Sequence, residues 1–350
     1  MRLPPAPVRR ALLPVQVVVL AGLLVLFVTG TEVGGAVAVF GSRRRPLRIS
    51  ALGVVYCTIE LAAIGRAGLL WLRFPGLGRR QPGSEESWLN ANQALLVWAL
   101  GRILGAACRC LGLVVTVEPP DPPSLGGTGP VLVLARHAGP GDSVALAHLL
   151  MSRYGRRARI VLKEILQIDP ALDLLLNRLD CCFLPSSAAA RNQRVQRIGR
   201  TAESLRPGEA LLLFPEGANW TPARRWRIVG HLRRRRKASA ARAAVLMTNV
   251  LPPHPGGVMA CLDARPDLEV VVLVHAGLDR ISSVRQALDA IPFHCPMTVR
   301  MWPAARPPMA EDERRSWLKA EWAVLDEWID RYHANPAGIP SSSRALPGPD

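Results

Sequence analysis

The chain opens with two long apolar runs and then alternates between short strand-like runs and amphipathic segments. Residues 11–40 carry a single charge, Glu32, and residues 49–72 form the second apolar run. Each run is long enough to enter a bilayer. A cleaved signal peptide is not expected, because the first run is too long and a second one follows it. The pattern therefore predicts a helical anchor inserted in a membrane over residues 1–76.

Arginines flank both apolar runs, and their positions limit how the anchor is placed in a membrane. The clusters are Arg9 and Arg10, then Arg43–Arg45, and then Arg73, Arg79 and Arg80. Positive-inside logic cannot put all three clusters in the cytoplasm if both runs cross the membrane. A re-entrant or shallow helical pair in one leaflet satisfies all three, and a single span followed by an interfacial segment is the alternative. Two buried core helices of a soluble protein are a third interpretation.

Residues 77–87, LGRRQPGSEES, are polar and turn-rich, and we interpret them as a linker to a domain over residues 88–334. An amphipathic helix is expected from Trp88 to about Leu111, after which strands and helices alternate as in an α/β fold. The expected strands are 114–118, 131–135, 159–163, 181–185, 210–215, 269–276 and 298–302. The expected helices are 143–153, 167–178, 189–206, 235–248 and a terminal amphipathic helix with Trp317, Leu318, Trp322, Leu325 and Trp328 on one face. The tail, residues 335–350, is expected to be disordered.

The composition is both apolar and strongly basic. Hydrophobic residues make up 49% of the 350 residues, the mean hydropathy is +0.16 and the formal net charge is +17. This combination indicates contact with an anionic membrane surface or with acidic substrates. Nucleic acid is not an expected partner, because nucleic-acid binders interleave aromatic with basic residues and aromatic residues are only 5% here.

The seven cysteines give no sign of a disulfide framework or a metal site. They include Cys108 and Cys110 and the adjacent pair Cys181 and Cys182, but no CxxC pair, and no histidine spacing completes a zinc site. We therefore expect reduced, mostly buried thiols in a protein that faces the cytosol, and no metal.

Two of the predicted strands end in turns that carry polar groups. In VLVLARHAGPGDS, residues 131–143, the strand runs into His137, and a Gly-Pro-Gly turn leads on to Asp142. Asp142 precedes an apolar helical run, so capping that helix is its simplest role. In LLLFPEGANWT, residues 211–221, the second turn carries Glu216. Because open α/β sheets place their sites at the carboxyl ends of strands, we expect the two turns to form one site.

The chain offers a general base but no evident nucleophile. It contains no GxSxG elbow, and Ser143, beside Asp142, lacks the setting of a nucleophilic serine. A histidine with an acidic partner suits a base that acts on a substrate hydroxyl. The reaction would be direct acyl or phosphoryl transfer to that hydroxyl. Phosphoryl transfer would require a phosphate-binding glycine-rich loop, and no Walker A sequence is present.

At these motifs the chain resembles the glycerolipid acyltransferases, the lysophosphatidic acid acyltransferase family. His137 to Asp142 matches the HX4D motif of that family, and FPEG at 214–217 matches its second signature. LPP at 251–253 resembles the last, proline-containing block, and KEILQIDP at 163–170 is similar to the Lys-Glu-Leu segment between the two main motifs. The resemblance covers residues 90–330, and the Arg-rich stretch and Trp-rich last helix resemble the longer lysophospholipid acyltransferases.

The resemblance implies a mixed sheet flanked by helices, in a membrane-bound O-acyltransferase of phospholipid biosynthesis. His137 would take the proton from the hydroxyl of a lysophospholipid such as lysophosphatidic acid, and Asp142 would orient His137. The hydroxyl oxygen would attack the thioester of acyl-CoA or of an acyl carrier protein. The residues implied in substrate binding are Phe214, Pro215, Glu216 and Gly217, with Lys163, Arg136 and Arg191 as candidate phosphate partners. No cofactor is implied, and the catalytic domain would face the cytoplasm at the cell membrane, in contact with anionic lipids.

The sequence departs from the family pattern at two positions that are expected to hold the acceptor phosphate. Ala218 and Asn219 follow FPEG where the family usually has Thr and Arg. After CFLP the chain continues with Ser186, and Arg191 is the nearest basic residue. The acceptor headgroup is therefore open, whereas the HX4D motif is intact.

Two other functions remain open from the sequence. Within enzymes the alternative is an esterase or lipid hydrolase, and outside them it is a non-catalytic basic membrane adaptor. The run RRWRIVGHLRRRRKASAAR, residues 224–242, fits either a solvated helix face or a surface for anionic headgroups or the phosphates of CoA.

Overall fold

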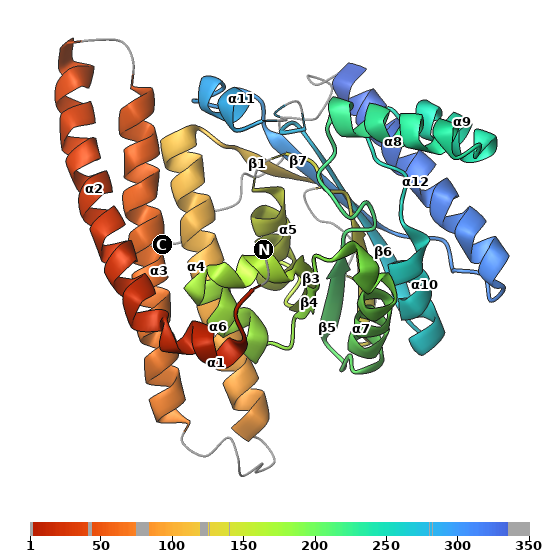
Figure 1. The fold of residues 1–350 in the computed structure, drawn as a ribbon, viewed down its shortest axis with the longest axis horizontal. Coiled ribbons are helices and arrows are strands. Elements are labelled where there is room, and N and C mark those ends of the chain that lie inside the picture. Colours follow the sequence, from red (N-terminus) through yellow and green to blue (C-terminus); the bar gives the residue numbers. More distant parts are fainter. Residues whose placement is uncertain are drawn as a thin grey trace.

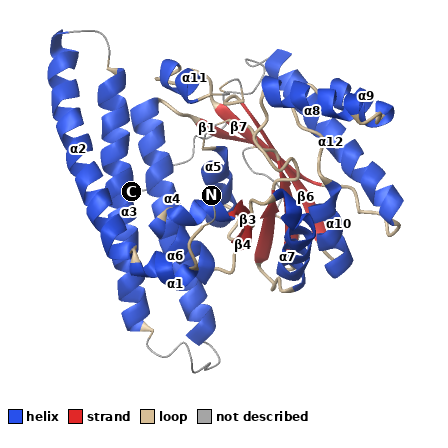
Figure 2. Cartoon of the chain, viewed as in Figure 1, coloured by secondary structure: helices blue, strands red, loops and turns tan. Residues whose placement is uncertain are grey.

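The computed structural model describes residues 3–40, 44–74, 84–119, 125, 127–139, 141–279, 281 and 283–334. The expected tail, residues 335–350, lies outside the described residues, as do residues 77–83 of the expected linker. Helices surround a twisted sheet, and two long helices stand at one side of the molecule (Figures 1 and 2).

The described strands form one mixed sheet, which confirms the fold class that the sequence implied. In spatial order they are β1 (Val115–Glu118), β7 (Met297–Pro303), β6 (Glu269–Ala276), β2 (Val131–Ala135), β5 (Glu209–Leu213), β3 (Arg157–Lys163) and β4 (Cys182–Leu184). The strands from β6 to β4 are all parallel, β7 is antiparallel to β6, and β1 is parallel to β7. The carboxyl ends of β6, β2 and β5 therefore meet at one edge of the sheet.

Helices cover both faces of the sheet and bury β2 and β5 along their whole length. One face carries α4 (Ser84–Leu111), α5 (Asp142–Ser152) and α6 (Pro170–Arg178), and the other carries α7 (Arg191–Glu203), α10 (Pro255–Ala264) and α12 (Glu311–Ala334). In β2, Val131 and Val133 belong to the first core, whereas Leu132 and Leu134 belong to the second. This two-sided burial explains why β2 reads as a continuous apolar run rather than an alternating one.

The terminal helix packs as its spacing predicted. Its five apolar positions are all buried in the second core, and Trp322 is fully inaccessible. The indole of Trp317 also donates to the carbonyl of Ala305 at 2.9 Å. The shorter elements are the 3₁₀ turns η1 (Glu164–Ile168) and η2 (Ala188–Ala190) and the helices α8 (Pro222–Arg234), α9 (Ala238–Leu246) and α11 (Val284–Asp289).

The two apolar runs form a helical pair beside the α/β domain. After the short α1 (Ala6–Ala11), α2 (Leu13–Phe40) is apolar on all sides and exposes most of its large side chains. The next helix, α3 (Arg45–Arg73), packs between α2 and α4. Leu13–Ala36, Arg45–Arg73 and Ser84–Leu111 are each long and apolar enough to cross a membrane. Of the three, only α2 leaves nearly all of this apolar surface uncovered, so it is the part that most needs a lipid environment.

Both ends of α3 are tied to the α/β domain. At its start, the Arg45 side chain donates to the carbonyl of Ile291 at 2.9 Å. Near its end, Arg178 of α6 donates to the carbonyl of Ala67 at 2.9 Å. Helix α3 therefore lies along the domain for most of its length instead of leading away from it (Figure 1).

The N-terminal end of the pair also contacts the domain. Arg9 of α1 makes a two-pronged ion pair with Asp173 of α6, at 2.8 and 3.0 Å, and both side chains are nearly buried. The Gln16 side chain donates to the carbonyl of Ile168 at 3.1 Å. Arg9 and Arg45, at opposite ends of the helical pair, are thus both held at the domain.

Two boundaries predicted from the sequence were wrong. Helix α4 begins at Ser84 and takes in residues 84–87 of the expected linker, because Glu85 and Glu86 in its first turn favour a helix N-terminus. The helix expected over residues 235–248 is replaced by α8 and α9, which are separated where Arg236 adopts a φ of 54°. Helices α10 and α11 were not predicted.

Candidate active site

The two polar turns meet at the carboxyl edge of the sheet, as expected. They follow β2 and β5, which are paired in parallel, so their ends lie side by side. The backbone N–H of Trp220, after the second turn, donates to the carbonyl of His137 at 2.7 Å. The two loops are therefore fixed to each other by the backbone and not only by proximity.

His137 and Asp142 form a direct pair. Nδ1 of His137 lies 2.8 Å from Oδ2 of Asp142, and the Asp142 side chain is 2% exposed whereas that of His137 is 26% exposed. Oδ2 also accepts from the N–H of Ala138 at 2.8 Å, and Oδ1 accepts from the N–H and hydroxyl of Ser143 at 2.6 and 3.0 Å. A carboxylate fixed in this way orients the imidazole and leaves Nε2, on the other side of the ring, as the basic nitrogen.

Asp142 is held in its ionised form. Burial by itself would raise the pKa of Asp142, but the hydrogen bond with His137 and the nearby His275 nitrogen outweigh it, so the pKa lies well below its usual range. At neutral pH the carboxylate therefore faces the Nδ1 side of His137 with its full charge, and the Nδ1–H tautomer is favoured.

Capping is not the role of Asp142. The N-cap residue of α5 is Gly141, at a φ of 76°, with no side-chain cap bond, and Asp142 is already the first helical residue. The turn before it depends on Gly139, at a φ of 93°, where a Cβ atom would lie 2.8 Å from the carbonyl oxygen of Leu278. The glycine turn thus aims Asp142 back at His137, and of the two roles that the sequence left open for Asp142, the structure does not show capping.

Glu216, for which the resemblance implied a role in substrate binding, is bonded to the protein itself. Its side chain is buried, with Oε2 accepting from the N–H of Leu251 at 3.0 Å and Oε1 from the N–H of His137 at 3.4 Å. Burial raises the pKa of Glu216 to about 8, although the charge of Arg136 and these two hydrogen bonds oppose the shift. Glu216 therefore fastens the FPEG turn to the LPP segment and to His137.

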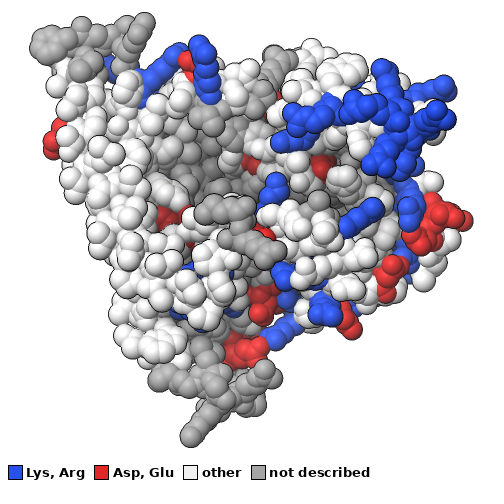
Figure 3. Space-filling view, viewed as in Figure 1, with Lys and Arg blue, Asp and Glu red and all other residues white. Residues whose placement is uncertain are grey.

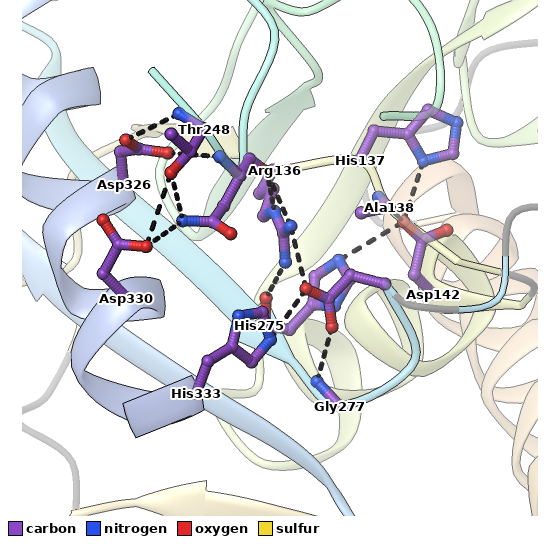
Figure 4. Close-up of polar contacts among 12 residues, drawn as sticks. Arg136, His137, Ala138, Asp142, Thr248, His275, Gly277, Asp326, Asp330 and His333 are labelled. Atoms are coloured by element: carbon purple, nitrogen blue, oxygen red, sulfur yellow. Dashed lines mark hydrogen bonds and ion pairs between the residues drawn. The ribbon is translucent and has the colours of Figure 1, made fainter. Parts of the chain in front are cut away.

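Arg136 is also not a phosphate partner in this structure, because its side chain is completely buried. Its guanidinium donates to the carbonyl of Asn249 at 2.6 and 3.2 Å and to the carbonyl of His275 at 2.6 Å. It also pairs with Asp279 at 3.3 Å. Figure 4 shows this guanidinium among polar groups of the interior. The sequence suggested an exposed cation, but the side chain instead ties together the ends of β2 and β6.

His275 lies near the His137–Asp142 pair and was not predicted from the sequence. It lies at the end of β6, fully buried, with Nε2 at 3.3 Å from Oδ2 of Asp142. The signal was a histidine near the carboxyl end of an expected strand. That signal could be interpreted only once β6 was known to lie beside β2.

The remaining candidate residues lie around the FPEG turn or along the same sheet edge. The ring of Phe214 packs 4.8 Å from that of His137, measured between centroids. The carbonyl of Pro215 accepts from the N–H of His254 at 2.8 Å, and Gly217, at a φ of 65°, leaves room for the His254 ring. Lys163 is exposed at the end of β3.

Arg191 is related to the FPEG turn by way of His254, which packs against that turn. Arg191 is exposed, at the first position of α7. Burial lowers the pKa of His254, and the positive charges of Arg191 and Arg194 lower it further. The structure thus places His254 next to Gly217, within the electrostatic influence of Arg191 and Arg194.

Within the described ranges, no three His, Cys, Asp or Glu side chains are grouped so as to hold a metal ion. The thiols of Cys108, Cys181, Cys182 and Cys261 have pKa values raised chiefly by burial, so they are not activated as nucleophiles. Among the described side chains, His137, Asp142, Glu216 and His275 are the titratable groups that contact the His137–Asp142 pair or belong to it.

Comparison with known proteins agrees with this geometry. Residues 116–272, which contain both turns, match the family model described as acyltransferase. The match to this acyltransferase model therefore covers the segment that carries His137, Asp142 and the FPEG turn. No curated protein sequence matches the chain.

Among solved structures, the crystal structure of PlsC, the 1-acyl-sn-glycerophosphate (LPA) acyltransferase from Thermotoga maritima, has the same fold. The TM-score is 0.52 at 15% sequence identity, over 83% of this chain and 98% of that chain. The likeness extends beyond the segment that the family model matches. Together with the family match, it confirms the resemblance to the glycerolipid acyltransferases that the two motifs indicated.

Glu216 is expected to give the α/β domain a pH-dependent stability whose sign follows from its raised pKa. Between the ordinary carboxyl pKa and about 8, the folded state holds a proton that the unfolded state has lost, so stability falls as pH rises through this window. Glu216→Gln stays neutral and keeps an acceptor, and its melting temperature should fall less than that of the wild type between pH 6 and pH 8.5.

Glu269→Gln, at an exposed position on β6, is the matched control and should follow the wild type. Melting curves in detergent measure all three proteins. Parallel pH profiles for wild type and Glu216→Gln would show that Glu216 is ionised throughout this range.

Proposed function

We propose that this protein is an O-acyltransferase that transfers a fatty acyl chain from a thioester donor to the free hydroxyl of a lysophospholipid. The observation that carries the proposal is the pairing of a partly exposed His137 with a buried, ionised Asp142 where the two loops meet. Such a pair serves as a general base. The acyltransferase domain supports acyl rather than phosphoryl transfer.

The contacts of Ser143 argue against the esterase alternative. A serine hydrolase needs its nucleophilic hydroxyl within hydrogen-bond reach of the base. The hydroxyl of Ser143 donates to Asp142 at 3.0 Å, on the side of the carboxylate opposite the oxygen that bonds His137. The acceptor hydroxyl of the substrate is therefore the nucleophile in our proposal.

The reaction is a single acyl transfer. Nε2 of His137 removes the hydroxyl proton while the oxygen attacks the thioester carbonyl carbon, which forms the C–O bond of a tetrahedral intermediate. Asp142 stabilises the imidazolium that results. Collapse of the intermediate breaks the C–S bond, and the thiolate takes the proton from His137, leaving the enzyme unchanged.

Two exposed cations are proposed as partners of the acceptor phosphate. Arg191 lies with Arg194 beside His254 and the FPEG turn, and Lys163 lies at the end of β3, the strand next to β5. An exposed guanidinium can bind a phosphate in a bidentate manner, which the buried Arg136 cannot do. The acyl donor is acyl-CoA or an acyl carrier protein, and no further cofactor enters the reaction.

The helices α8 and α9 form a basic surface next to the site, defined by residues 224–242. No acidic residue occurs between Glu216 and Asp263 in the sequence. Arg225 is buried and donates to the carbonyls of Val245 and Met247 at 2.6 and 2.7 Å, which fixes α8 against α9. Figure 3 shows the remaining cations gathered at this end of the molecule, far from α2. Its place away from the apolar helices favours the anionic group of a soluble donor over lipid headgroups.

We also propose that the helical pair inserts into one leaflet of the cell membrane, with the catalytic domain in the cytoplasm. Arg9 and Arg45 lie at opposite ends of α1–α2 and yet both contact the domain. A pair that crossed the bilayer would place these contacts on opposite sides of a hydrocarbon core about 30 Å thick. Shallow insertion keeps the arginines at the anionic surface, and the lipid acceptor can enter the site from the same leaflet.

His137→Ala should lower the rate of acyl transfer by about 10² to 10⁴, because general-base action is the effect removed. Purified protein in detergent, acyl-CoA or acyl carrier protein, and a panel of lysophospholipids would be assayed by thiol release. His294→Ala, at an exposed loop position, is the control and should retain activity. Wild-type turnover by a folded His137→Ala protein would refute the assignment. If added salt by itself abolished all function of the wild type, the adaptor alternative would be favoured.

The membrane arrangement predicts how single cysteines react in intact cells. Pro5→Cys, Ser42→Cys and Ser239→Cys, in a background without the seven native cysteines, should all resist an impermeant thiol reagent until the cells are lysed. Ser239 is the control for the domain, since it is exposed on α9. Labelling at position 42 from outside would contradict insertion into one leaflet, and labelling at position 5 alone would indicate a single span.

A further inference from the structure

A second histidine reaches the catalytic carboxylate from inside the domain. Nε2 of His275 lies 3.3 Å from Oδ2 of Asp142, the same oxygen that bonds Nδ1 of His137 at 2.8 Å. Figure 4 shows the Asp142 carboxylate between the two imidazole rings. One ring is partly open to solvent, whereas the His275 side chain is wholly buried. The two histidines therefore cannot have the same function.

The backbone of His275 is held from both sides. Its strand pairs with β2 on one side and with β7 on the other, where His275 stands opposite Val299. Its carbonyl accepts from the guanidinium of Arg136 at 2.6 Å. A side chain on such a doubly paired strand has little freedom to move away from Asp142, which suits a fixed partner better than a mobile acid or base.

Charged and titratable groups face His275 from several elements. Arg136 comes from the end of β2, His137 and Asp142 from the following loop, and Glu216 from the loop after β5. Asp279 follows β6, and His333 of α12 lies 3.1 Å from Asp279. Asp279 pairs with both Arg136 and His333, so it is already occupied. Asp142 is the carboxylate within reach of His275.

We propose that His275 is a positioning residue, whose Nε2–H donates to Asp142 and fixes the plane of the carboxylate that orients His137. In the described part of the chain neither ring nitrogen of His275 has a well-aligned hydrogen bond, so Asp142 is the partner that a small rotation of the ring would satisfy. The inference rests on the proposed acyl transfer, because it assigns His275 a role in the work of the His137–Asp142 pair.

The assignment has two kinetic consequences. Because a hydrogen bond from His275 takes up part of the negative charge of Asp142, its loss leaves more of that charge facing His137. His137 would then take up its proton at a higher pH than in the wild type. The acidic limb of the kcat profile should therefore move to higher pH. The KM for the lipid acceptor should stay unchanged, because His275 is buried and does not reach the surface where substrate binds.

The test compares His275→Leu, which removes the donor, with His275→Gln, whose amide nitrogen reaches close to the position of Nε2. We expect kcat to fall by about 10- to 100-fold in His275→Leu, because the His137–Asp142 pair is misplaced. Most of this loss should be recovered in His275→Gln. His148→Leu removes a half-buried histidine of α5 and is the control for a purely structural effect. It should leave the acidic limb in place.

A second readout does not depend on activity. Nitrogen-15 spectra of histidine-labelled protein, assigned with His275→Gln, report which ring nitrogen carries the proton. We expect the Nε2–H form for His275 and a large change in its ring shifts in Asp142→Asn. The proposal would be overturned if His275 carried its proton on Nδ1 and its ring shifts did not change in Asp142→Asn. It would also be overturned if the pH profile of kcat for His275→Leu were identical to that of the wild type.

The two readouts also separate this inference from the proposed function. If the wild type transfers no acyl group with any donor and acceptor, the proposed function fails. The spectra would then still decide whether His275 donates to Asp142.

Discussion

The arrangement of this site depends on one buried negative charge, the carboxylate of Asp142. An ionised carboxyl removed from water is costly unless it is paired and hydrogen-bonded. Here the N–H groups of Ala138 and Ser143, the Ser143 hydroxyl and two imidazoles surround it. These partners outweigh the cost of burial and keep the pKa of Asp142 low. Any change that lets the turn relax would remove the charge that makes His137 a base.

A second buried charge holds the frame around the first. Arg136, one residue before His137, joins the ends of β2 and β6 to the carbonyl of Asn249. The Asn249 backbone in turn donates to Asp326 of α12 at 2.7 Å. The HX4D loop is therefore connected to the C-terminal helix through buried polar contacts, and removal of one partner would leave a buried charge unpaired, at a cost of about 3 to 5 kcal/mol. This explains why Arg136, a basic residue next to His137, points into the interior.

The local pattern of apolar and polar residues predicted most of the strands and helices and the two motifs. It did not predict which polar groups face each other. The continuous apolar run of β2 and the helical spacing of Trp317, Trp322 and Trp328 on α12 are both visible in the local sequence, so both elements were found from it. Arg136, Glu216 and His275 were misjudged or missed because their direction depends on which strands are neighbours. The break between α8 and α9 at Arg236 was missed because a non-glycine residue at positive φ has no signal in the apolar pattern.

The central claim is that the charge of Asp142 drives chemistry, and Asp142→Asn tests it most directly. Asn keeps the size of the side chain and one oxygen that can accept from the N–H group of Ala138 or from that of Ser143, so the protein should still fold, with a melting temperature lowered by the donors that lose their acceptor. The kcat for acyl transfer should fall by about 10⁴, as expected when a histidine base loses its orienting carboxylate. A folded Asp142→Asn protein with near-normal kcat would contradict the account.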